Sequence, residues 1–305
     1  MNRNSPYYAQ VQLLIRLLPM VAAETCFALK GGTAINLFVR DFPRLSVDID
    51  LVYLLSSNRA EALADIRTAL DRLADAFSKV VPGIKIVKSY NDKQDALRLV
   101  VERNSARIKI ELSPVSRGTV YPSETRSVVA AVEDEFGFAE TQVVSFEDLF
   151  AGKICAALDR QHPRDLFDIR LLLANEGLTA SLKQAFLAYL ISHQRPMEEL
   201  LAPNLKDLSR IYTDEFEGMT QGNASLDELE QARADLIVGL HESLDDNDKR
   251  FLCSVYERNP QWALLGLDGI DELPAVQWKL KNIEKMPGSR RAECLKSLKH
   301  ILKQN

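Results

Sequence analysis

Apolar and polar positions in the first half of the chain follow two periods, one helical and one extended. The helical period predicts helices over residues 6–28, bent near Pro19, and over residues 57–78. Between Thr33, as its cap, and Arg40 we expect a third, short helix. Short alternating or β-rich runs predict strands over 46–53, 84–87, 97–102 and 108–112. This half of the chain is therefore predicted to be a small α/β sheet domain.

From Val143 onward the strand signals fade and the helical period dominates. Helices are predicted over residues 146–159, 164–175, 180–193, 227–243, 248–259 and a basic C-terminal stretch. We therefore predict a bilobed protein, with a first domain over residues 1–144 and an all-helical second domain over residues 145–305.

Composition is that of an ordinary globular protein, with 46% hydrophobic and 27% charged residues in 305. No apolar run approaches the roughly 18 residues that a membrane span needs, and the N-terminus lacks the pattern of a secretory leader. We therefore expect a cytoplasmic protein without membrane contact. The cysteines occur singly, without the spacing of a structural zinc site, and are interpreted as buried or incidental thiols: Cys26, Cys155, Cys253 and Cys294.

Charge is unevenly distributed, although the formal total is only −5. Basic residues crowd the last stretch of the chain, interrupted only by Glu284 and Glu293: Lys279, Lys281, Lys285, Arg290, Arg291, Lys296, Lys299 and Lys303. Two interpretations stay open at this point, a solvated helical face and a surface that contacts RNA phosphates.

The pair Asp48 and Asp50 carries the strongest chemical signal. Because side chains alternate along a strand, both carboxylates and Ser46 are expected on one face. Two carboxylates on one face repel each other, and a hard cation with oxygen ligands, such as Mg²⁺, relieves that repulsion. Upstream, Gly31 and Gly32 allow backbone N–H groups to approach a phosphate. The combination predicts a nucleotide site.

Glu111 lies on the polar face of the alternating strand at 108–112. On a strand next to the aspartates it would supply a third carboxylate, able to hold metal or to accept a proton from an attacking hydroxyl. The alternative is that Glu111 belongs to an ordinary solvated strand face.

Lys153 falls within the apolar stripe of the helix at 146–159, so its stem must be covered while its ammonium needs an anion. The anion is predicted to be a triphosphate; a snorkelling lysine at the lobe boundary is the alternative. Asp165 and Asp168 share a face of the next helix. Asp165 also suits the helix N-terminus electrostatically, and Arg160 or Arg164 is expected to neutralise or orient Asp168.

Five motifs in order resemble those of the AbiEii/AbiGii toxin-type nucleotidyltransferases, which include the MenT toxins. They are Gly-Gly-Thr-Ala-x-Asn-Leu, Arg-x-Ser-x-Asp-x-Asp-Leu, Ile-Lys-Ile-Glu, Lys-x-x-Ala and Arg-Asp-Leu-Phe-Asp-Ile, within roughly residues 25–175. The resemblance implies a polymerase-β-like nucleotidyltransferase lobe joined to a helical lobe. It also implies a nucleoside triphosphate substrate, Mg²⁺ or Mn²⁺, a cognate antitoxin and, by analogy with some members, tRNA as acceptor.

By the same resemblance, individual residues match the family's motifs. The metal-holding carboxylates would be Asp48 and Asp50, with Glu111 as the third, and catalytic roles would extend to Lys153 and Asp168. Nucleotide-binding positions would be Gly31, Gly32, Thr33, Ser46, Lys153 and Asp165. This chain has Gly-Gly where other branches of the superfamily have Gly-Ser, which removes a hydroxyl donor at that turn. Backbone N–H groups can substitute for it.

Function is therefore predicted to be metal-dependent transfer of a nucleotide to an acceptor hydroxyl, by a toxin of a toxin–antitoxin or abortive-infection system. Other readings remain: transfer to a protein side chain or to Ser46 itself, and a degenerate nucleotidyltransferase that only binds a partner. A nucleotide-sugar glycosyltransferase also uses a strand-borne Asp-x-Asp pair, but the glycine turn and the Glu111 strand favour the first reading.

Overall fold

The computed structural model describes residues 6–55, 58–91, 93, 95–220, 222 and 224–303. They pack into two compact units: residues 1–145 with the short segment 219–222, and residues 146–218 with 223–305. The proposed division into a nucleotidyltransferase domain, residues 1–144, and a helical domain, residues 145–305, stays a prediction. Each unit is described by itself.

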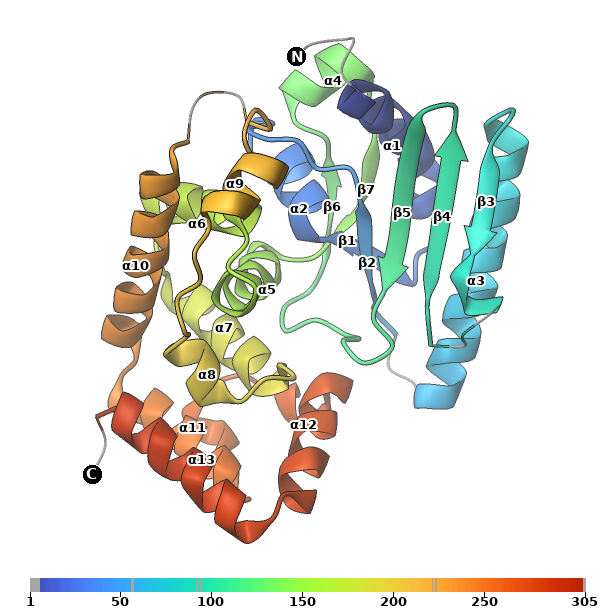
Figure 1. Cartoon of the computed structure of the whole chain (residues 1–305). Helices are drawn as coiled ribbons and strands as arrows, with labels where there is room; N and C mark the ends of the chain where they lie inside the picture. The colour runs from blue at the N-terminus through green and yellow to red at the C-terminus, as the bar shows by residue number, and fades with distance from the viewer. Residues whose placement is uncertain are drawn as a thin grey trace. The chain divides into compact units, whose positions relative to one another are not determined.

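A mixed sheet organises the first unit (Figure 1), in the order β3-β4-β5-β2-β1-β7-β6. Its strands are β1 (Phe27–Lys30), β2 (Ile49–Tyr53), β3 (Lys85–Lys88), β4 (Arg98–Arg103), β5 (Ala106–Leu112), β6 (Glu124–Ser127) and β7 (Glu140–Val143). Strand β2 runs antiparallel to β1 and parallel to β5. The centre of the sheet therefore carries both predicted carboxylate strands as direct neighbours.

Helices α1 (Pro6–Ala22) and α3 (Arg59–Val80) lie side by side against the sheet. The inward residues Ile49, Leu51 and Ile110 are fully buried. A short α4 (Ala130–Phe136) and a helix made of α2 (Gly31–Ala34) and a π-helical continuation (Ile35–Val39) complete the unit. Since Ile49 pairs with Ile110 and Asp50 with Glu111, the carboxylates lie on the face away from these apolar residues.

Two short segments far apart in sequence meet in this unit. The Leu45 N–H donates to the Met219 carbonyl at 3.0 Å, and Arg44 pairs with Thr220 in an isolated antiparallel bridge. The chain that leads into the Asp48–Asp50 segment is thereby hydrogen-bonded to a segment from much later in the chain.

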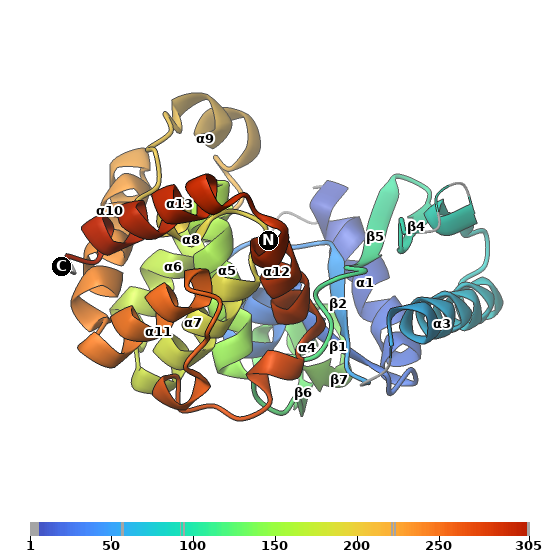
Figure 2. The ribbon, with the colours of Figure 1, turned by 90° about the horizontal axis from the view of Figure 1, so that it is seen from below.

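The second unit is helical in its described residues (Figure 2). Its α-helices are α5 (Phe146–Asp159), α6 (Pro163–Asn175), α7 (Ala180–Ser192), α8 (Met197–Leu201), α9 (Ser209–Glu215), α10 (Leu226–Ser243), α11 (Asp246–Tyr256), α12 (Pro274–Lys285) and α13 (Gly288–Ile301). Helix α5 is central, packing against α6, α7 and α8. Within the described ranges of both units, no helix is long and apolar enough to cross a membrane.

Most predicted elements are present. The predicted strand over 46–53 begins only at Ile49, so Ser46 and Asp48 precede it, and further differences lie at the glycine turn. The helix begins at Gly31 with Lys30 as its cap, so the prediction that Thr33 caps it is wrong. Strand β1 escaped prediction because its four residues form a short buried run without alternation. All four cysteines are free, and three are buried.

Candidate active site

The glycine pair packs directly against the aspartate strand. Gly31 has a φ of +75°, which a residue with a Cβ adopts only at a cost. A Cβ at Gly31 would also overlap the Asp50 carboxylate, and one at Gly32 would lie 2.8 Å from both Arg44 Nη2 and Ser46 Oγ. Glycine is therefore required twice, because the first turn of α2 lies against Asp50 and Ser46.

Thr33 connects the first turn of α2 to the segment that contains Ser46 and Asp48. Its hydroxyl is bonded to Ser46 Oγ at 3.1 Å and donates to the Asp48 carbonyl. Asn36, one turn later, donates from Nδ2 to the Gly32 carbonyl at 2.8 Å. The buried Arg44 donates from Nη1 to the Leu45 carbonyl at 2.8 Å. Thr33 thus holds the Ser46–Asp48 segment against α2 instead of capping the helix.

Four charged residues from neighbouring strands lie in one row across the sheet. Lys30 of β1 is the register partner of Asp50, Asp50 that of Glu111, and Glu111 that of Arg98 of β4. Side chains of register partners point to the same face, and adjacent strands are about 4.8 Å apart. Arg98 also forms an ion pair with Glu111. The structure therefore brings Asp50 and Glu111 side by side, each flanked by a cation.

The fit of a divalent metal can be judged from these donors. Asp48, Asp50 and Glu111 supply only carboxylate oxygens, the ligands that Mg²⁺ and Mn²⁺ prefer. In the described ranges, however, no three or more His, Cys, Asp or Glu side chains are gathered closely enough to hold a metal. The chemistry of these donors therefore suits a divalent metal. Their side chains are not gathered around one point, and Glu111 forms an ion pair with Arg98.

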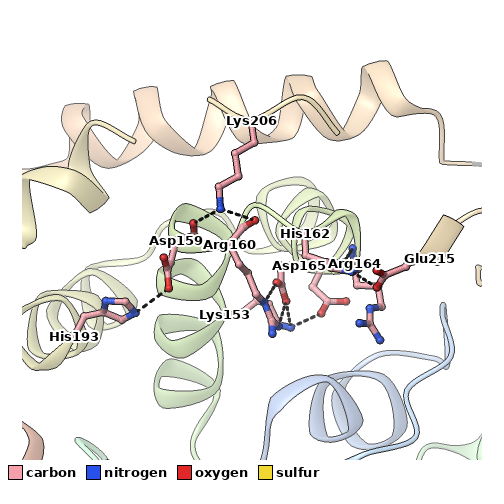
Figure 3. A network of polar contacts seen from close by, with 10 residues as sticks. Lys153, Asp159, Arg160, His162, Arg164, Asp165, His193, Lys206 and Glu215 are labelled. Atoms are coloured by element: carbon pink, nitrogen blue, oxygen red, sulfur yellow. Dashed lines mark hydrogen bonds and ion pairs between the residues drawn. The ribbon is translucent and has the colours of Figure 1, made fainter. Parts of the chain in front are cut away.

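The second unit contains the other predicted residues in a buried cluster of alternating charge (Figure 3). Lys153 Nζ of α5 lies 2.8 Å from Asp165 Oδ1 and 3.0 Å from Asp168 Oδ2 of α6. The Lys153 side chain is 6% exposed and the two aspartates at most 1%. The anion that the lysine requires is thus supplied by the protein itself, and it joins two helices.

Arg160 completes this cluster from the loop between α5 and α6. Its Nε and Nη2 both donate to Asp165, the latter at 2.9 Å, and its side chain is 62% exposed. Burial alone raises the pKa of the Asp165 carboxyl, but Lys153 and Arg160 outweigh it and hold that pKa far below its usual value. Arg160 or Arg164 was expected to neutralise or orient Asp168. Arg160 forms an ion pair with Asp165, and Lys153 forms ion pairs with both aspartates.

Sequence reasoning missed the network that fixes the Arg160 loop. Gln161, at a φ of 53°, is buried; its Nε2 donates to the Asn204 carbonyl, and its Oε1 accepts from Arg233 Nη1 at 2.9 Å. The Lys206 ammonium donates to the carbonyls of Asp159 and Arg160. These polar residues come from distant segments and show no periodic signal, so only the tertiary structure identifies them.

His162 caps α6. Its Nδ1 accepts from the Arg164 N–H at 3.1 Å, which leaves Nε2 as the protonated nitrogen of a neutral ring, 3.1 Å from Glu215 Oε2. Burial lowers the pKa of His162, against the opposing effect of Glu215. In the same unit, burial lowers the pKa of His193, against Asp159. Both rings are therefore held neutral by the fold.

Acidification should accordingly destabilise the protein. As pH falls below about 6.5, the unfolded chain binds protons on these histidines that the folded chain does not, so the free energy of unfolding decreases. Urea unfolding at pH 7.5, 6.5 and 5.5 measures this. The variant H162N retains a side-chain cap and should show a shallower decrease; an unchanged slope would contradict the role of His162.

Comparison with known proteins places this geometry in a family. The family model "Nucleotidyl transferase AbiEii toxin, Type IV TA system" matches residues 12–280. No curated protein sequence matches. Among solved structures, MenT4, a nucleotidyltransferase toxin from Mycobacterium tuberculosis H37Rv, is similar with a TM-score of 0.62 and 15% identity, over 93% of this chain and 95% of that one. The predicted family resemblance and fold class are confirmed.

At this low identity, the likeness to MenT4 concerns the fold alone. The family model spans both units, from α1 to α12. It includes the residues around Asp50 and Glu111 in the first unit and those around Lys153 in the second. The chain therefore belongs to the AbiEii family of nucleotidyltransferase toxins of type IV toxin–antitoxin systems.

Proposed function

We propose that this chain transfers a nucleotide from a nucleoside triphosphate to a hydroxyl of RNA, with tRNA as the expected acceptor, in a reaction that depends on Mg²⁺ or Mn²⁺. One observation carries the proposal: Asp50 and Glu111 are register partners on adjacent parallel strands, beside a glycine turn that cannot accept a Cβ. Family membership supplies the reaction class and a cognate antitoxin as partner.

Substrate binding is assigned to the residues around the glycine turn. Backbone N–H groups in the first turn of a helix have no intrahelical acceptor, and those of Gly31 and Gly32 are proposed to donate to a phosphate oxygen. Ser46 offers a hydroxyl at the same place, and Thr33 holds Ser46 in position. Lys30, in register with Asp50, adds a positive charge for the triphosphate.

Proton transfer is assigned to Glu111. Its carboxylate is the base for the attacking acceptor hydroxyl, and the Arg98 ion pair keeps it oriented in the absence of substrate. Asp48 and Asp50 would hold the divalent metal, with Glu111 as a further ligand. When bound, the metal would stabilise charge on the attacking and leaving oxygens, as a two-metal site does.

Lys153 is proposed to offset charge on the triphosphate, with Asp168 and Asp165 as its positioning partners. Two of its three N–H donors face the aspartates, which leaves one for a phosphate oxygen. Because the Lys153 side chain is buried and ion-paired, its conformation is already restricted. Little further conformational entropy is therefore lost when it binds a ligand.

Labelling tests the proposed function. The purified chain is incubated with each α-labelled ribonucleoside triphosphate, with Mg²⁺, Mn²⁺ or a chelator, and with a tRNA pool or a protein mixture. We expect metal-dependent label in tRNA and none with D48N. Label on the chain itself that S46A abolishes would indicate self-modification, and label in other proteins a protein acceptor. No transfer under any condition would leave a binding subunit.

A further inference from the structure

Helix α12 carries an exposed tryptophan that is followed by two exposed lysines. Trp278 is 54% exposed, although a tryptophan buries more apolar surface than most residues when it is covered. Lys281 and Lys285 follow it at three and seven positions, which places all three side chains on one side of the helix, and both lysines are exposed. This combination, named here the Trp278 face, consists of Trp278, Lys281 and Lys285.

The opposite side of α12 is firmly packed, so the Trp278 face is not the result of a loose helix. Ala275, Val276 and Ile283 are buried. Lys279 is buried too, and its ammonium donates to the carbonyls of His193 and Arg195 at 2.7 and 2.6 Å. The expectation that Lys279 belongs to the basic surface is therefore wrong: it anchors the helix.

Charge around this face favours an anionic partner. Besides the buried Lys279, residues 274–305 hold seven of the 38 basic residues and two of the 43 acidic ones, while the rest of the chain carries 30 basic and 41 acidic residues. Lys281 and Lys285 repel each other at a spacing of four, which costs a helix a few tenths of a kcal/mol. Within the described residues, neither has a carboxylate at ion-pair distance to relieve that repulsion.

We propose that the Trp278 face binds a single-stranded segment of the acceptor RNA, with a base stacked on Trp278 and phosphates next to Lys281 and Lys285. The proposal rests on the proposed function, because it assigns the acceptor of that reaction a place on the chain. RNA is favoured over an acidic protein because an exposed indole with two lysines next to it matches both parts of a nucleotide. Bases stack on aromatic rings and phosphates release counterions to lysines.

Tryptophan fluorescence tests the stacking directly. The chain has two tryptophans, and the other, Trp262, packs its ring against Phe251 at 5.6 Å. In W262F, Trp278 is the sole reporter, and titration with an oligoadenylate of about ten nucleotides should quench it saturably. Unchanged fluorescence at oligonucleotide concentrations that saturate binding would overturn the proposal.

Affinity measurements test the contribution of each residue. W278A should weaken oligoadenylate binding by about tenfold or more, while W278F should stay near the wild-type affinity because its ring still stacks. The double variant K281Q/K285Q should reduce the slope of log affinity against log salt by about 1.4. As the matched control, K85Q removes a highly exposed lysine of the first unit and should leave the slope unchanged. Wild-type affinity in W278A would contradict the proposal.

The two proposals can fail separately. D48N should bind oligoadenylate like the wild type even though it transfers nothing. If the wild type binds RNA through Trp278 but labels no acceptor, the proposed function fails and the binding face stands. If the wild type labels tRNA and W278A raises neither the KM for tRNA nor the dissociation constant, the binding face fails and the function stands.

Discussion

The variant D50N should lose about a thousandfold in nucleotidyl transfer while it folds like the wild type. Asparagine has the size of aspartate but no charge, so the close packing against Gly31 is retained. The lost charge removes a metal ligand, and metal stabilisation of the transition state contributes several kcal/mol, each 1.36 kcal/mol corresponding to about tenfold. Initial rates of label transfer to tRNA measure the effect.

A control at another aspartate of the same unit separates this role from a general effect of charge. Asp134, on α4, is exposed and distant in sequence from the carboxylate row, so D134N should transfer at the wild-type rate. If D50N retains transfer within about threefold of wild type while the triphosphate is bound normally, Asp50 does not hold the metal.

Of the variants considered, K153M, which removes the Lys153 ammonium, should show the largest decrease in the free energy of unfolding. In K153M, two carboxylates that are at most 1% exposed lose the cation between them. Breaking a buried ion pair by removing one partner costs about 3–5 kcal/mol, because the remaining charge is left buried. Urea unfolding of the wild type and K153M at neutral pH gives this difference.

Two further variants decide whether the loss comes from uncompensated charge. K153M/D168N also removes the buried charge of Asp168 and should be more stable than K153M alone, while Asp165 keeps its ion pair with Arg160. K109M deletes an exposed lysine from β5 and should change the free energy of unfolding by no more than about 0.5 kcal/mol. A K153M variant as stable as K109M would show that the cluster contributes nothing to folding.

The local patterns around the two clusters were predictable because they depend on neighbours in sequence. The apolar stripe predicted that Lys153 is covered and needs an anion, and it is buried. That Asp48 and Asp50 share a face stays a prediction, because β2 begins only at Ile49. The anion itself was not predictable. Asp165 and Asp168 meet the ammonium because α5 packs against α6.

The partners of residues that belong to no local sequence pattern could not be predicted. Gln161 accepts hydrogen bonds from Lys206 and Arg233, which lie 45 and 72 positions later in the chain. The sequence around each of the three residues contains no pattern that identifies its partner. The prediction for Lys279 was wrong for a related reason. In sequence this lysine resembles its basic neighbours, and only the packing of α12 turns its ammonium inward to two carbonyls.

For this chain, the individual motifs, the secondary-structure periods and the excess of positive charge near the C-terminus can be read from local sequence, because each is a property of residues close together. The tertiary structure decided which charges meet. Asp50 stands beside Glu111, Arg98 pairs with Glu111, and Lys153 lies between two aspartates. Strand register and helix packing follow from the burial of apolar faces across the whole unit, and no local pattern contains them.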